Sequence, residues 1–198
     1  MKEDGSLVIC LPGKGESSLL GSNFFAFAGP LNDKDGLEPI LLGLQQANRK
    51  AAHIPYAFRL EQEEGFSEDG EPSGSSGRAM LELLRSKGLF GYLAVVRYFG
   101  GRKLGVGNLR RMVIEASSAA IADATIKQVV HRERYTVSLD YAAYSSLLSL
   151  SGKLGFEAVT LSQGENAICQ VIVDPVQREE LLGRGYALEG GETVETLI

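Results

Sequence analysis

The stretch SEDGEPSGSSGRAMLELLRSKGLFGYLAVVRYFGGRKLGVGNLRRMVI, residues 67–114, decides the fold of this chain. It holds two glycine-rich loops, at 69–77 and 100–108. Each loop is followed by apolar residues at the i, i+3, i+4, i+7 spacing of an amphipathic helix. A run rich in β-branched and aromatic residues, Tyr92 to Phe99, lies between them and predicts a strand. The stretch therefore predicts two helices that each begin at a glycine-rich loop, with one strand between them.

Each loop also carries residues that are typical of a helix start. Gly, Pro, Ser and Asp are too dense in 69–77 for regular structure, and a serine hydroxyl there can accept from the unpaired N–H groups of the helix that follows. The candidate capping residues are Ser73, Ser75 and Ser76. The second helix is predicted over 107–124, with Gly107 or Asn108 at its start.

Helix starts of this kind suit an anionic ligand. They offer free N–H donors and the positive end of a dipole, and glycines let a phosphate approach the backbone. Residues 78–134 hold 11 lysines and arginines against four acidic residues, in a chain of net charge −5. The alternative is that the glycines only make turns and the arginines are solvated. The residues that we predict to bind nucleic acid or another anion are Arg78, Arg97, Arg102, Lys103, Arg110, Arg111, Ser73, Ser75, Gly74, Gly100, Gly101, Gly105 and Gly107.

Two glycine-containing runs partly match known nucleotide-binding motifs. The run 105–110, GVGNLR, lacks the last glycine of the dinucleotide fingerprint. The run 13–17, GKGES, lacks the Walker spacing and the hydroxyl directly after lysine. The sequence thus excludes a P-loop NTPase and a Rossmann dehydrogenase.

We identify no catalytic constellation. The chain has two histidines, His53 and His131, and a serine triad would need one of them beside a nucleophile; no G-x-S-x-G motif supplies it. Glu68, Asp69 and Glu71 can chelate Mg²⁺ or act as general acid and base, but they lie on one loop, where charges commonly face water. We therefore expect no metal and no cofactor, and an enzyme is the less favoured class.

Some residues near the loops are assigned a supporting role. Glu71 can hold Arg97 or Arg102 in place by a charge-assisted hydrogen bond, and the sequence does not decide between the two. The supporting residues are His53, Arg59, Asp69 and Glu71.

The same stretch resembles the IMPACT family, which includes bacterial proteins and eukaryotic relatives in translational control. The matching motifs are EDGEPSGSSG at 68–77, VVRYFGGRKLGVGNLRRM at 95–112 and HIPYAFR at 53–59. The chain departs from the family pattern at Pro55, at Asn108, where glycine is usual, and at Arg110 and Arg111, where a position is usually apolar or singly basic.

The remaining periodicities predict an α+β fold. Strands are expected at 6–11, 23–28 and 55–61, a Gly/Ser-rich loop at 12–21 and an amphipathic helix at 37–51. Residues 124–133 read as a connecting strand or linker. Beyond it, residues 135–198 hold three basic and nine acidic residues, and this change of sign indicates a domain boundary.

We expect two domains, at 1–130 and 134–198. The second has elements in the β-α-β-β-α-β order of ferredoxin-like domains: strand 134–140, helix 141–153, strands 156–162 and 167–173, helix 175–184 and strand 192–198. The family resemblance implies that the first is an α/β domain similar to a ribosomal-protein fold and to domain IV of elongation factor G.

Composition indicates a soluble cytoplasmic protein. No run of 18 apolar residues is present, so no membrane span or membrane partner is expected, and the apolar run Leu7–Leu11 is too short for a signal peptide. Cys10 and Cys169 form no metal-binding spacing and are expected to be free thiols. Nothing in the sequence sets an oligomeric state.

Three functions remain open at this point. The first is a regulator of translation that binds RNA or the ribosome through the basic glycine-rich loops. The second is a protein-interaction module of translational or stress control, because a basic surface also suits an acidic protein partner. The third and least favoured is an enzyme or binder of a phosphorylated small molecule.

Overall fold

The structure is a computed structural model that describes residues 2–198, so Met1, the first residue of the expected N-terminal domain, lies outside it. The chain divides into two compact units, Met1–Val129 and Val130–Ile198. One strand, β7 (Thr125–Leu139), begins in the first unit and ends in the second. It unites the segment predicted as a connecting strand or linker with the strand predicted at 134–140. In the part of the chain that is described, no helix is long and apolar enough to cross a membrane.

The first unit is built on a mixed sheet around one buried strand. This strand, β6 (Leu89–Tyr98), is almost wholly buried and includes the strand predicted between the two loops. It pairs antiparallel with β3 and β4 and parallel with β1. The other strands of the unit are β1 (Leu7–Leu11), β2 (Gly13–Leu19), β3 (Ser22–Gly29), β4 (Tyr56–Arg59) and β5 (Glu64–Ser67).

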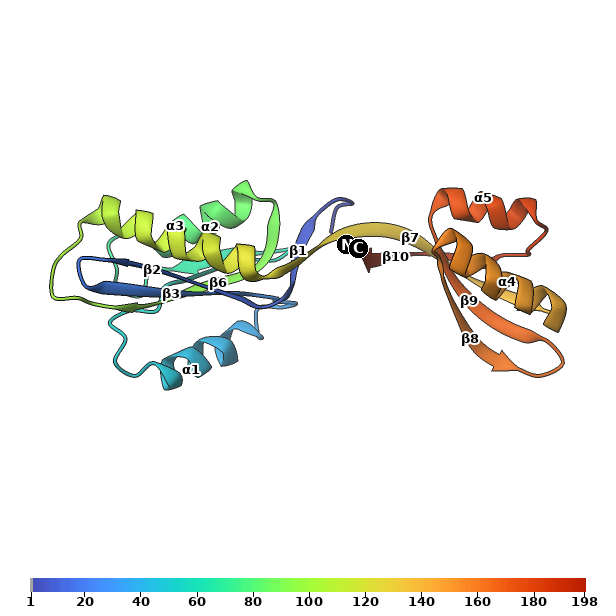
Figure 1. The fold of residues 1–198 in the computed structure, drawn as a ribbon, viewed down its shortest axis with the longest axis horizontal. Coiled ribbons are helices and arrows are strands. Elements are labelled where there is room, and N and C mark those ends of the chain that lie inside the picture. The colour runs from blue at the N-terminus through green and yellow to red at the C-terminus, as the bar shows by residue number, and fades with distance from the viewer. Residues whose placement is uncertain (1) are drawn as a thin grey trace. The chain divides into compact units, whose positions relative to one another are not determined.

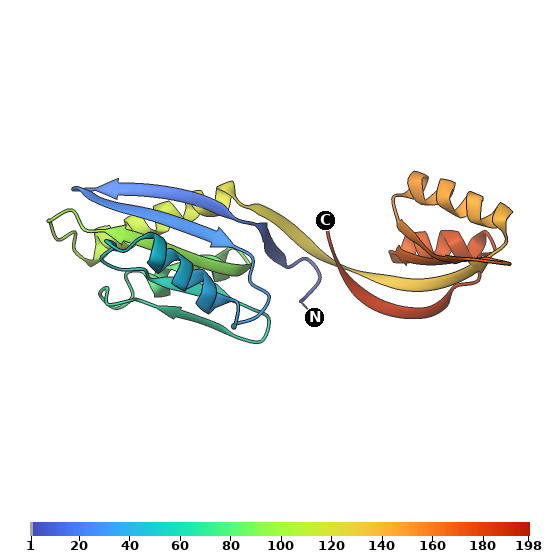
Figure 2. The ribbon, with the colours of Figure 1, turned by 90° about the horizontal axis from the view of Figure 1, so that it is seen from below.

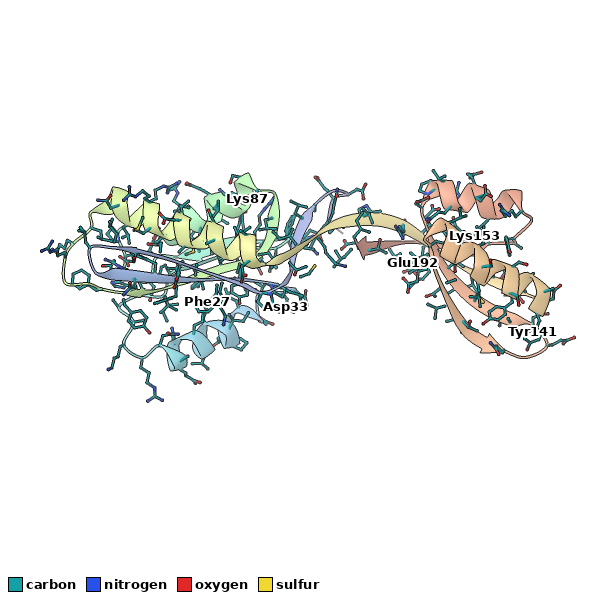
Figure 3. The ribbon with its side chains drawn as sticks, in the orientation of Figure 1. Phe27, Asp33, Lys87, Tyr141, Lys153 and Glu192 are labelled. Carbon is teal, nitrogen blue, oxygen red and sulfur yellow. The ribbon has the colours of Figure 1, made fainter. Side chains whose placement is uncertain are left out.

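Helices cover both faces of this sheet (Figure 1). On one face α2 (Gly77–Ser86) and α3 (Val106–Asp123) bury the apolar stripes that their sequences predict, including Met80, Leu84 and Met112. On the other face lies α1 (Leu37–Ala47), and Phe27 of β3 packs in the apolar cluster that the sheet forms with this helix (Figure 3). The sheet therefore has a core on each side, which explains why β6 is apolar along nearly its whole length.

The loop predicted at 12–21 is wrong, because these residues form β2 and its turn into β3. The glycines that indicated a loop have a packing role. A Cβ on Gly13 would lie 2.2 Å from the Ala120 carbonyl oxygen, and one on Gly15 would lie 2.3 Å from that of Ala116. Glycine is needed here so that the strand can lie directly against α3.

Helix α1, strand β4 and strand β5 also differ from the prediction. Strand β4 is shorter than the strand expected at 55–61. Helix α1 ends at Ala47 and not at 51, because the Asn48 side chain donates to the Leu44 carbonyl oxygen at 2.8 Å and its main chain leaves helical geometry. Strand β5 was not predicted. It pairs along β4 and forms the approach to the first glycine-rich loop.

The second unit has the element order predicted for it. After β7 come α4 (Tyr141–Leu154), β8 (Glu157–Gln163), β9 (Ala167–Val173), α5 (Pro175–Gly183) and β10 (Glu189–Leu197). The strands lie in the order β8-β9-β7-β10. Leu147 of α4 and Leu181 of α5 belong to one apolar cluster, so both helices cover the same face of the sheet (Figure 2).

Polar contacts fix the helix starts and one edge of this unit. Asp140 caps α4 by accepting from the Ala143 N–H at 2.8 Å, and Asp174 with Gln177 forms a capping box at α5. On β10, Glu192 accepts a hydrogen bond from Arg134 of β7 (Figure 3).

Candidate anion-binding site of the first unit

The first glycine-rich loop is held in a tight turn between β5 and α2. Asp69 and Gly70 both have positive φ, at 47° and 81°, which is the geometry of a turn that favours Asp-Gly. At the end of the loop a Cβ on Gly77 would lie 2.2 Å from the Ser67 carbonyl oxygen, so α2 starts in direct contact with β5. These two requirements explain why the loop is rich in glycine.

The N-terminus of α2 is capped by Glu68. The prediction that a serine caps this helix is wrong. The Glu68 carboxylate accepts from the N–H groups of Gly74, Ser76, Gly77 and Arg78 at 2.8 to 3.3 Å. Its full negative charge suits the helix dipole better than a neutral hydroxyl does. The predicted phosphate position at this helix is thus taken by the protein's own carboxylate.

The serines of the loop have other roles. Ser75 is buried, and its hydroxyl donates to the Pro72 carbonyl oxygen at 2.6 Å. Ser76 is the residue before the helix, and its side chain makes no capping bond. Ser73 is exposed.

Glu71 binds Arg97, which resolves the choice between Arg97 and Arg102. Nη1 of Arg97 lies 2.5 and 2.6 Å from the two carboxylate oxygens of Glu71. Both residues are buried at 7% exposure. The Arg97 guanidinium also lies 5.5 Å from the ring centre of Phe24 and 5.6 Å from that of Phe99. Arg97 therefore joins the first loop to the sheet and is not a surface cation.

The N-terminus of α3 differs from that of α2 because no side chain of residues 2–198 caps it. The helix begins at Val106, after Gly105 with φ of 75°, one residue earlier than Gly107. Asn108 donates to the Leu104 carbonyl oxygen at 3.0 Å, which closes the loop without covering the first N–H groups. No atom within 4 Å opposes a Cβ on Gly105 or Gly107, so the backbone here is open to a ligand.

Gly100 and Gly101, which precede α3, have different structural roles: the first is packed against another turn and the second lies in open space. A Cβ on Gly100 would meet the carbonyl carbon of Gly21 at 2.1 Å, and its N–H donates to the Ser22 hydroxyl at 3.1 Å. Gly100 therefore joins the loop to the β2–β3 turn, and both lie at the same end of the sheet (Figure 2). Gly101 has φ of 82° and open space around it.

The predicted basic residues other than Arg97 fall into two groups. Arg78 and Arg110 both reach Glu82, at 3.4 and 2.6 Å, and Arg110 also donates to the Gly74 carbonyl oxygen at 3.0 Å. The hydrogen bond from Arg110 lowers the pKa of the Glu82 carboxyl group. Arg110 thus joins the first turns of α3 to the first loop and to α2, whereas Arg78 pairs within α2.

The second group consists of Arg102, Lys103 and Arg111. All three are exposed. Over residues 2–198, none of them makes a hydrogen bond or an ion pair. They lie in the loop before α3 or in its first two turns, and their charge is available to a ligand.

A cavity of about 510 Å³ lies between the two loops. It brings together five of the predicted residues: His53, Glu71, Arg97, Lys103 and Gly105. Nδ1 of His53 lies 2.6 Å from the Asp69 carbonyl oxygen, and the Asp69 carboxylate accepts from the Ile54 N–H at 2.5 Å. His53 and Asp69 therefore hold the first loop against the segment before β4.

Arg59 is not part of this arrangement. It lines a separate cavity with Phe90 and Glu64, where its guanidinium lies 4.4 Å from the Phe90 ring centre and 3.9 Å from the Glu64 carboxylate.

Two cations at the same end of the sheet were not predicted as site residues. Arg49 and Lys50 follow α1 and are exposed. Asn48 accepts from the Tyr98 hydroxyl at 2.9 Å, and the Ala52 N–H donates to the Arg97 carbonyl oxygen at 2.8 Å, so this segment lies beside the end of β6. The sequence predicts both on the polar face of a helix that extends to residue 51. Because α1 ends at Ala47, they lie instead in the segment that follows the helix.

Comparison with known proteins decides the family. The Impact N-terminal domain matches residues 20–121, just over half of the chain, and this range includes all three motifs. The chain belongs to the IMPACT family. The resemblance predicted from the motifs is thereby confirmed.

Curated members of the IMPACT family match this chain over part of its length. YigZ of Escherichia coli is 34% identical over 46% of this chain and 46% of its own. A family member of Haemophilus influenzae is 34% identical over 55% and 52%, and one of Thermus thermophilus is 38% identical over 46% and 49%. The matched region thus spans about half the length of these relatives.

One solved structure supports the fold of the chain. A protein described as hypothetical aligns over 94% of this chain and 97% of its own with a TM-score of 0.62, at 21% identity. At this identity the likeness concerns the fold alone. It extends over both units, so the mixed α/β architecture is shared along nearly the whole chain.

Proposed function

We propose that this IMPACT family member is a regulator of translation that binds RNA or the ribosome through the basic end of its first unit. We define this basic end as Arg49, Lys50, Arg102, Lys103 and Arg111 with the N-terminus of α3. The observation that carries the proposal is that Arg102, Lys103 and Arg111 are exposed and make no hydrogen bond or ion pair with residues 2–198, beside a helix start that no side chain of these residues caps. Phosphate groups are the ligands that free cations and free helix N–H groups prefer.

The wider fold is consistent with this proposal. The sheet order β8-β9-β7-β10 with two helices on one face supports a ferredoxin-like assignment of the second unit. The likeness of the first unit to a ribosomal-protein fold and to domain IV of elongation factor G rests on the family resemblance. Fold alone does not establish function, so the basic end has to be tested directly.

The test is binding of the purified chain to ribosomes, bulk tRNA and a random single-stranded RNA over a series of salt concentrations. We expect affinity to fall steeply with salt, because each phosphate contact releases counterions. The Arg102→Glu/Lys103→Glu variant is expected to lose most of the binding. Lys87→Glu/Lys153→Glu is the matched control, since it changes the same charge at two exposed lysines outside the basic end (Figure 3).

Three results would count against RNA. Binding that does not depend on salt, equal loss in the control variant, or no binding by the wild type would each contradict the proposal. In the last case a pull-down that survives nuclease treatment and yields one stoichiometric protein would favour the alternative of an acidic protein partner.

A further inference from the structure

The cavity between the two loops has an interior and a rim of different chemistry. Its interior wall is mainly apolar and comes from Pro72, Leu104, Val106 and Leu109. Phe99, directly after β6, also lines it and leaves 51% of its surface exposed. A volume of about 510 Å³ is typical of sites for small organic ligands.

The charge inside this cavity is already balanced. Arg97 is the buried cation of the wall, and both Glu71 oxygens bind its Nη1. A phosphate therefore gains little by entering. Nε of Arg97 is buried and has no hydrogen-bond acceptor among residues 2–198. The guanidinium thus keeps donors for a neutral group that carries acceptors.

Uncompensated charge lies at the rim. Lys103 lines the cavity and is exposed, and Arg102 precedes it. Gly105 and Val106, which begin α3, also line the cavity, so the free N–H groups of the helix start lie at the same place. An apolar interior with hydrogen-bond donors, beside a rim that attracts phosphate, matches the two halves of a nucleotide.

We infer that this cavity binds one unstacked nucleobase against Phe99, with its phosphate at Lys103 and the N-terminus of α3. This inference rests on the proposed function and narrows it to single-stranded RNA, since bases inside a duplex are already stacked and paired. Aromatic side chains are the usual platform for such bases.

The test compares three ligands by competition with a fluorescent single-stranded RNA. They are the same RNA unlabelled, its abasic counterpart and a duplex of equal length. We expect the abasic strand and the duplex to bind about tenfold more weakly than the intact strand, because one base–aromatic stack is lost. Adenosine and uridine monophosphates, added separately, decide whether a free nucleotide fills the cavity as well as a base within a chain does.

Variants of Phe99 test whether the base binds in this cavity. Phe99→Ala should weaken binding of the intact strand about tenfold and leave the abasic strand unchanged, whereas Phe99→Tyr keeps the stack and should bind as the wild type does. Phe66→Ala is the matched control, because Phe66 is an exposed phenylalanine of β5 that does not line the cavity. Thermal melting of each variant establishes that it is folded.

The outcomes separate this inference from the proposed function. If the wild type binds RNA but neither Phe99→Ala nor removal of the bases weakens binding, the base site is overturned and RNA binding stands. If only the monophosphates bind, and Phe99→Ala abolishes this, the base site stands and RNA binding is overturned. If the wild type binds none of the ligands, both are overturned.

Discussion

At the scale of single residues, Glu68 determines how the first loop and α2 are joined. It accepts four main-chain N–H groups, so removal of its carboxylate leaves several donors unpaired at once. We expect Glu68→Ala to lower the free energy of unfolding by about 2 kcal/mol, as measured by urea denaturation. Glu115→Ala, at an exposed position of α3, is the control and should change it by less than about 0.5 kcal/mol. Equal effects would show that Glu68 is not the cap.

Sequence reasoning did not find the role of Glu68 because the contact is irregular. Helix caps are expected at the residue directly before the first turn. Here the loop folds so that Glu68, several residues earlier in the chain, contacts the N–H groups of the helix start. The serines, which fit the usual pattern, face the core or solvent instead. The pairing of Glu71 was foreseen as one of two alternatives, because a carboxylate beside the basic segment can hold an arginine by a charge-assisted hydrogen bond. The burial of Arg97, which was predicted to bind an anion, was not foreseen.

The Glu71–Arg97 pair is the second feature that depends on single residues. Both charges are buried, so loss of one partner leaves the other uncompensated. We expect Glu71→Gln to destabilise the first unit by about 3 to 5 kcal/mol. The double variant Glu71→Gln/Arg97→Met should recover much of this loss. A double-mutant cycle by urea denaturation measures the coupling, and additive effects would mean that the pair does not act as a unit.

At the scale of elements, periodicity located the helices and most strands. Helices α2 and α3 and most elements of the second unit follow from their apolar spacing, because each buries one stripe or one face. Strand β10 is the exception, since none of its residues is buried. Strand β2 was missed since its glycines carry the usual signal of a loop, and only the contact with α3 gives them another reason. Strand β5 was missed because it is short and forms one edge of a pair. Sequence patterns therefore predict well which side chains are buried. They predict poorly where two backbones lie in direct contact, because the glycines that allow this contact also occur in loops.

The contact between β2 and α3 gives a prediction at this scale. A methyl group at Gly15 would lie 2.3 Å from the Ala116 carbonyl oxygen, so α3 would have to move. We expect Gly15→Ala to lower the free energy of unfolding by about 1 to 3 kcal/mol. Gly43→Ala is the control. Gly43 is in α1 with no atom within 4 Å of a new Cβ, and alanine there should stabilise by about 0.5 to 1 kcal/mol. The two changes should thus differ in sign in urea denaturation.

At the scale of the whole molecule, charge is divided between two consecutive segments of the sequence. Residues 78–134 are basic and residues 135–198 are acidic, while the net charge is −5. Sequence alone reveals this division, since it is a matter of composition. What sequence cannot reveal is which cations remain available for a ligand. That depends on partners distant along the chain, because Glu71 lies 26 residues from Arg97 and Glu82 lies 28 residues from Arg110.

The acidic part of the chain should oppose RNA binding by repulsion. The variant Glu157→Gln/Glu165→Gln/Glu189→Gln removes three exposed acidic charges of the second unit and reduces the net charge from −5 to −2. If the basic end binds RNA, we expect this variant to bind more tightly than the wild type at low salt. The difference should disappear at high salt, because charges are screened beyond a Debye length of about 10 Å at 0.1 M. Affinities that are equal at every salt concentration would mean that the acidic residues lie too far from the bound RNA to act on it.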